Sequence, residues 1–152
     1  MNWTIQTDCD VCGCNRCAFR AEPDGSVKRL CNDADLLAMV DSYLETALWS
    51  STDESNEQGG DPLDDNHYTD DISDESFVSA IGDCESFLDC QADLLSDVEP
   101  ETAGHNFWLS RNGHGAGFFD SGAEHADALQ DATKPYGSVD LYVGDDGKVY
   151  GS

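Results

Sequence analysis

Two stretches of the chain carry apolar residues at the spacing of an α-helix. The first runs from Ala34 to Trp49, and Asn32 or Asp33 precedes it as a candidate N-cap. The second runs from about Asp74 to Asp97, with Ser73 as its candidate N-cap. Its apolar stripe consists of Phe77, Ile81, Cys84, Leu88 and Leu95. The pattern therefore predicts two long helices, each with one buried face.

Strands and turns are predicted nearer the two ends of the chain. Ala18–Ala21 and Ser26–Leu30 flank a turn at Pro23-Asp24-Gly25. Towards the C-terminus, Ser121 to Thr133 reads as a short helix. Val139, Leu141 and Val143 then alternate as a strand, and Asp146-Gly147 turns the chain into Lys148–Tyr150 as a hairpin.

The densest block of aromatic and glycine residues runs from His105 to Gly122 and reads HNFWLSRNGHGAGFFDSG. Asn112-Gly113 at its centre is a strong hairpin signal, because a type I′ turn needs φ > 0 at both positions. A two-residue turn there pairs Arg111 with His114, and His105 with Asp120. We therefore predict a motif hairpin over residues 104–122, with Trp108 lying over Gly117.

This block resembles a motif in a family of small, largely uncharacterised proteins of tailed viruses and prophages. The family motif reads roughly GHDFWLTRNGHGAGFWD, and the similarity covers Gly104 to Asp120 with departures at Asn106, Ser110 and Phe119. The stretches LWSSTDE, DPLDDN and YGSVDLYVGDDG also look similar. The resemblance implies a viral origin and a shared fold, and it implies no settled activity.

The length and the order of elements predict a single α+β domain over residues 1–152. We expect a small antiparallel sheet built from two hairpins and packed against the two longer helices. A Cys-rich segment, residues 1–31, precedes them. The apolar-poor stretch 50–72 is expected to form an acidic surface loop, in which solvated charge is favoured over a cation site because the register of a calcium loop is absent.

Charge excludes several function classes. The chain has 32 Asp and Glu against 7 Lys and Arg, a net charge of −25. Such a chain repels nucleic acid and anionic membranes, so we expect no direct binding to either. Two explanations stay open: adaptation to the high-salt cytoplasm of a halophilic host, and mimicry of DNA as a decoy for a DNA-binding host protein.

No apolar run reaches the length of a membrane span, and the N-terminus lacks the pattern of a signal peptide. We therefore expect the protein in the host cytoplasm during infection, with a place in the virion left open.

The Cys-rich segment suggests a metal. Thiolates in C-x-x-C pairs can bind a tetrahedral ion, although the two pairs lie closer together than in the usual structural zinc sites. The alternative is a set of reduced thiols packed as small apolar groups. The candidate zinc ligands are Cys9, Cys12, Cys14, Cys17 and Cys31.

The motif block supplies the remaining candidates. His105 opposite Asp120 offers an imidazole and a carboxylate that could orient it, whereas Arg111 and His114 would lie at the other end of the hairpin. A structural role for these residues is favoured over catalysis. As a binding surface we single out Trp108, Arg111, Asn112 and His114. The sequence thus predicts a non-enzymatic module that binds a host or viral protein; the alternative is an enzyme or small-ligand-binding protein that uses the motif hairpin.

Overall fold

The computed structural model describes residues 3–9, 11, 13, 16–53, 60–113, 117–118 and 125–151. The helices in these residues are α1 (Ala34–Ser50), α2 (Asp74–Cys90), α3 (Pro100–Arg111) and α4 (Ala126–Ala132). The strands are β1 (Thr4–Thr7), β2 (Arg16–Ala21), β3 (Val27–Arg29), β4 (Thr52–Asp53), β5 (Asp61–Pro62), β6 (Leu141–Val143) and β7 (Val149–Gly151).

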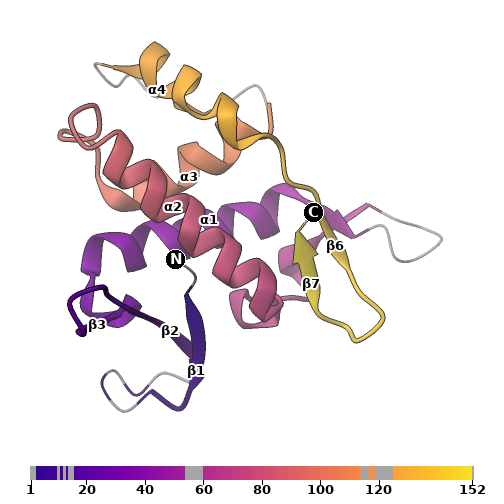
Figure 1. Cartoon of the computed structure of the whole chain (residues 1–152). Helices are drawn as coiled ribbons and strands as arrows, with labels where there is room; N and C mark the ends of the chain where they lie inside the picture. The colour runs from indigo at the N-terminus through magenta and orange to yellow at the C-terminus, as the bar shows by residue number, and fades with distance from the viewer. Residues whose placement is uncertain are drawn as a thin grey trace.

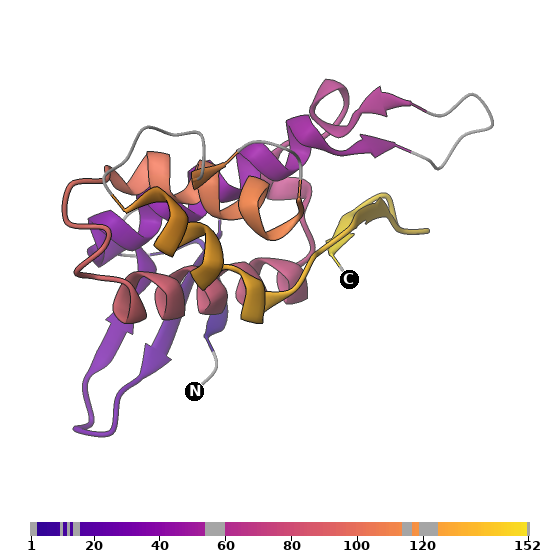
Figure 2. The ribbon, with the colours of Figure 1, turned by 90° about the horizontal axis from the view of Figure 1, so that it is seen from above.

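The strands form small antiparallel sheets of order β1-β2-β3, β4-β5 and β6-β7. Figures 1 and 2 show the helices grouped between the three-stranded sheet at one end and the two smaller sheets at the other. The predicted α+β class, with a Cys-rich N-terminal region, is confirmed. No helix in the described part of the chain is long and apolar enough to cross a membrane.

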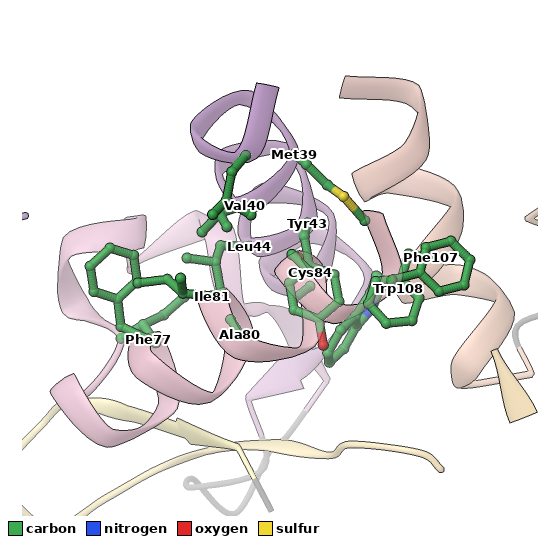
Figure 3. Close-up of a cluster of buried hydrophobic side chains, with 14 of the residues drawn as sticks. Met39, Val40, Tyr43, Leu44, Phe77, Ala80, Ile81, Cys84, Phe107 and Trp108 are labelled. Carbon is green, nitrogen blue, oxygen red and sulfur yellow. The ribbon is translucent and has the colours of Figure 1, made fainter. Parts of the chain in front are cut away.

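Helix α1 forms as its sequence predicts. The Asp33 side chain accepts a hydrogen bond from the Leu36 amide at 3.1 Å, which satisfies one of the unpaired donors of the first turn. The buried face of the helix contains Met39, Val40 and Tyr43, with Leu44 and Ala47 one turn further on. This face packs into the core that α1, α2 and α3 share (Figure 3).

The predicted motif hairpin is wrong, because its first half lies in α3. Pro100 occupies the first turn of α3, where its missing N–H removes no helical hydrogen bond, and Glu101 follows it near the positive end of the helix dipole. The helix ends at Arg111. The backbone amide of the C-cap residue, Asn112, donates to the Trp108 carbonyl oxygen at 3.3 Å, and Gly113 follows at φ +66°. The Asn-Gly pair therefore ends a helix here, since a C-terminal cap needs the same left-handed glycine as a tight turn.

Gly104 lets α1 and α3 approach closely. A Cβ at this position would lie 2.2 Å from the Met39 carbonyl oxygen and 3.0 Å from the Tyr43 backbone nitrogen. Both atoms belong to backbone, which cannot move aside as a flexible side chain can. The close contact of the two helices therefore depends on a missing side chain in the motif.

The core joins the helices through stacked aromatic rings. Phe87 of α2 stacks on Phe107 of α3, with ring centroids 4.4 Å apart and planes at 15°. Phe118 also stacks on Phe87, with ring centroids 5.7 Å apart. Tyr43 meets Trp108 edge to face, with centroids 5.3 Å apart. Such geometries add to the gain from burying the rings.

Two boundaries differ from the sequence prediction. Helix α2 ends at Cys90, and residues 91–97 form turns that bring Leu95 back into the core at 7% exposure. The described residues of the stretch 50–72 form more than the predicted acidic surface loop, because they contain β4, β5 and two 3₁₀ turns, η2 (Leu63–Asp65) and η3 (Thr69–Asp71). Leu63 and Ile72 anchor it, since both are fully buried.

Charged side chains add to the apolar contacts that hold the three-stranded sheet against α2. Arg20 of β2 and Lys28 of β3 both pair with Glu85, the latter at 3.0 Å. Arg16 donates to the backbone oxygens of Ile72 and Thr69, and its guanidinium lies over the Phe77 ring. Half-buried bases of the N-terminal segment thus help to hold the sheet against the helical core.

Candidate functional site

The N-terminal sheet brings three cysteines together. Cys9 follows β1, Cys17 lies in β2, and Cys31 lies in the 3₁₀ turn η1 (Leu30–Asn32) directly after β3. Antiparallel pairing places Cys17 opposite Gln6, which brings the end of β1 alongside it. Three consecutive elements therefore each deliver one thiol to the same point.

The chain bends sharply at Cys9. Asp8 adopts φ +52°, and the Gly13 amide donates to the Cys9 carbonyl oxygen at 2.9 Å, which closes a tight turn. Cys12 and Cys14 lie outside the described residues, so their predicted part in the site is not addressed by the structure.

The geometry of the three sulfurs suits a metal ion. Their Sγ atoms all lie within 4.8 Å of one another, and Cys9 Sγ and Cys31 Sγ are 3.9 Å apart. For Zn–S bonds of ~2.3 Å, two ligands of a tetrahedral site are separated by about 3.8 Å. Cys9 and Cys17 are buried, Cys31 is half-buried, and no disulfide joins two cysteines of the described part of the chain. This cluster could hold a metal ion.

Arg111 is the buried cation of the motif. Its side chain is 3% exposed and forms an ion pair of 2.8 Å with Asp83 of α2. It also donates to the Tyr43 hydroxyl at 2.9 Å and to the backbone oxygens of Tyr136 and Gly137 at 2.7 and 2.9 Å. Burial opposes its charge, but the Tyr43 oxygen and Asp83 outweigh this, and the pKa of Arg111 is raised.

Trp108 and Asn112 are likewise engaged inside the molecule. The Trp108 indole nitrogen donates to Ser50 Oγ at 2.8 Å, and the ring is 2% exposed. The Asn112 side chain accepts the Val139 amide hydrogen at 2.7 Å and donates to the Trp108 carbonyl oxygen at 2.9 Å. The motif therefore fastens the C-terminal segment to α3, rather than presenting these two side chains to solvent.

His105 lies elsewhere on α3. Its Nδ1 is 3.0 Å from Thr46 Oγ1, and its ring stacks on Trp49 with centroids 5.9 Å apart. Because Thr46 donates its hydroxyl hydrogen to the Ser42 carbonyl oxygen, it accepts one from Nδ1–H of His105. Six residues along a helix separate His105 from Arg111 by about 9 Å and turn them to different faces.

The structure thus does not bring His105 and Arg111 to one reaction centre. The partners predicted for them, Asp120 and His114, lie outside the described residues. The strand pairs predicted between residues 105 and 120 and between residues 111 and 114 cannot form, because His105 and Arg111 both lie in α3.

Sequence reasoning missed Asp83 and Tyr43. The sequence does indicate that Arg111 needs such partners, because Arg111 is the only lysine or arginine between Arg29 and Lys134. A single cation within an aromatic motif needs a buried acid and further acceptors. The sequence alone does not say which of the many acids supplies that partner.

No protein-family model, curated protein or solved structure matches the chain.

Proposed function

We propose that this chain is a small, non-enzymatic viral accessory protein that binds another protein and whose N-terminal sheet is held by zinc. The observation that carries the zinc assignment is the convergence of Cys9, Cys17 and Cys31 within 4.8 Å from three separate elements. Sulfur ligands favour zinc over hard cations, and a buried position is typical of a structural site.

A structural rather than a catalytic role is proposed for the motif because of how its side chains are used. Three of its described polar side chains, Trp108, Arg111 and Asn112, are engaged in internal hydrogen bonds that fix the fold. Their hydrogen bonds connect α3 to α1, α2 and the C-terminal segment, which is what a structural motif requires.

Zinc content tests the metal. We expect the reduced, purified chain to contain about one zinc ion when measured by plasma mass spectrometry. Cys17→Ser should lose the ion and lower Tm, because binding of a structural zinc contributes directly to folding. Cys90→Ser is the matched control, since Cys90 is exposed and outside the cluster. A wild-type chain without bound metal, unfolding at the same Tm with and without a chelator, would contradict the assignment.

The partner is tested separately. Tagged protein is incubated with lysate of infected host cells at native salt, and retained proteins are identified by mass spectrometry, with an unrelated acidic protein as control bait. Stoichiometric recovery of a DNA-binding protein that added duplex DNA releases supports the decoy. A retained protein that DNA does not release supports a different binding role, and no retention contradicts both.

The acidity itself is better explained by a high-salt cytoplasm. Exposed acids occur on every described helix, for example Asp35, Asp89 and Glu101, and in turns such as Asp64-Asp65 and Asp145-Asp146. DNA mimicry needs carboxylates in rows spaced like phosphates, whereas general adaptation to salt spreads them over the surface. The wide distribution therefore supports adaptation over the decoy.

A further inference from the structure

A cavity of about 330 Å³ lies beside the motif helix. Its inner wall is formed by Tyr43, Trp108 and Arg111, and its rim includes Ser79 of α2 and Ser138 and Val139 of the C-terminal segment. The rim is held in place by the motif, because Asn112 accepts the Val139 amide hydrogen. Volumes of this size are typical of small-molecule sites.

Tyr43 brings an unused hydrogen-bond donor to this cavity. Its side chain is 3% exposed, and its oxygen accepts a hydrogen from Arg111. Among the hydrogen bonds of the described residues, none uses the hydroxyl hydrogen of Tyr43 as donor. Figure 3 shows the Tyr43 oxygen pointing away from Val40 and Leu44 and lying beside the Trp108 indole. A buried donor without an acceptor is costly, so an occupant that accepts this hydrogen is favoured.

The hydroxyl keeps its hydrogen at ordinary pH. Burial raises the pKa of Tyr43, and the positive charge of Arg111 offsets only part of that effect. The group therefore acts as a donor and not as a phenolate.

The charges of the wall favour an uncharged occupant. Arg111 is neutralised by Asp83, and both line the cavity. An anion would be repelled by Asp83 and by the net charge of −25, whereas a cation would be repelled by Arg111 in the cavity wall. The wall therefore offers neither an anion nor a cation an unpaired opposite charge.

Shape and size narrow the class further. The indole of Trp108 and the ring of Tyr136 line the cavity, and flat rings pack well against such walls. A cavity of about 150 Å³ holds benzene, so the larger volume here accommodates a molecule of about two rings.

We propose that this cavity binds an uncharged two-ring aromatic molecule whose ring nitrogen or carbonyl oxygen accepts the hydroxyl hydrogen of Tyr43. The proposal is independent of the zinc site and of the protein partner.

The test compares two probes of nearly equal size on the full chain. Benzimidazole carries an acceptor nitrogen, and indole lacks one. Binding is followed by NMR through the Trp108 indole N–H signal, assigned with Trp3→Phe and Trp49→Phe. We expect benzimidazole to bind about three- to tenfold more tightly than indole, the gain of one neutral hydrogen bond. This comparison uses no variant of the cavity and so does not depend on how a variant folds.

Variants then locate the site. Tyr43→Phe should remove the preference for benzimidazole, and Ser79→Phe should block both probes by filling the rim. Asp89→Phe, on the same helix and away from the cavity, should bind both as the wild type does. Equal affinities for the two probes, no saturable shift with either, or unchanged binding to Ser79→Phe would each overturn the proposal.

Discussion

Gly104 sets the distance between α1 and α3, because a side chain there would overlap backbone atoms of Met39 and Tyr43. We expect Gly104→Ala to lower the free energy of unfolding by about 2 kcal/mol or more, as overpacking against rigid backbone does. Gly82→Ala is the control: it is also helical, but a Cβ there meets nothing within 4 Å. That change should be neutral or stabilise by up to about 1 kcal/mol. Urea unfolding measures both, and equal effects would refute the close contact.

Arg111 is the second residue on which the fold depends. Arg111→Met should lower the free energy of unfolding by about 2–3 kcal/mol, because Asp83, Tyr43 and two carbonyl oxygens lose their donor. The expected loss of stability is smaller than for a fully buried ion pair, because the Asp83 side chain is 37% exposed.

Lys134→Met provides the comparison for Arg111. Lys134 pairs with Asp131 at 3.0 Å, but both side chains are more than 70% exposed, at 73% and 72%. The change should therefore lie within about 0.5 kcal/mol. A similar loss for the two variants would show that Arg111 contributes only a surface pair.

At the scale of elements, Glu85 joins the three-stranded sheet to α2. Burial alone raises the pKa of its carboxyl, but hydrogen bonds and charge from Arg20 and Lys28 outweigh this, and the pKa is lowered below 4.5. A carboxyl whose pKa is lowered by folding stabilises the protein at pH values above its pKa in the unfolded chain. That contribution is lost as pH falls through its pKa in the folded protein.

We therefore expect wild type to exceed Glu85→Gln in Tm at pH 6, and the difference to shrink as pH falls from 5 towards 3. The difference is informative because titration of the other acids affects both chains alike. Asp89→Asn, on the exposed face of the same helix, should show little dependence of this kind. A difference that stays constant down to pH 3 would contradict the role of Glu85.

The elements themselves were predictable from sequence where local signals agreed. The N-cap of Asp33 and the apolar face of α1 predict that helix almost to its ends, and the turn residues predict β2–β3 and β6–β7. The motif was misread because Asn112-Gly113 suits both a type I′ turn and a helix end. The packing of Gly104 on α1, a contact between distant segments, favours the helix.

The candidate site was predicted in part for the same reason. The spacing of cysteines indicated a metal, and the structure joins Cys9, Cys17 and Cys31. Which thiols converge depends on the register of β1 and β2, which the sequence pattern left open. The partners of Arg111 come from α1 and α2, and no local pattern around Arg111 specifies them.

At the scale of the whole molecule, the net charge of −25 opposes compaction. The screening length falls from ~30 Å at 0.01 M salt to ~3 Å at 1 M. We expect Tm to rise over this range by at least about 2–4 °C, equivalent to ~1 kcal/mol. A variant with Asp89, Asp93 and Asp97 changed to Asn should depend less on salt. A Tm that does not change with salt would rule out repulsion as a significant cost.

The contacts that hold the N-terminal sheet determine how easily it unfolds locally. Glu85 lies 65 and 57 residues from the bases that hold it, and the edge strands β1 and β3 bury no residue fully. Within the three strands of this sheet only Cys17 and Ala18 are buried, and an element with so small an apolar face opens at lower cost than one attached by a large apolar face. This end of the molecule should therefore detach as a unit while α1, α2 and α3 stay packed. Amide hydrogens of β2 would then exchange with solvent before those of α1. A metal bound by the cysteines would slow this exchange, because it would join β2 to the ends of β1 and β3.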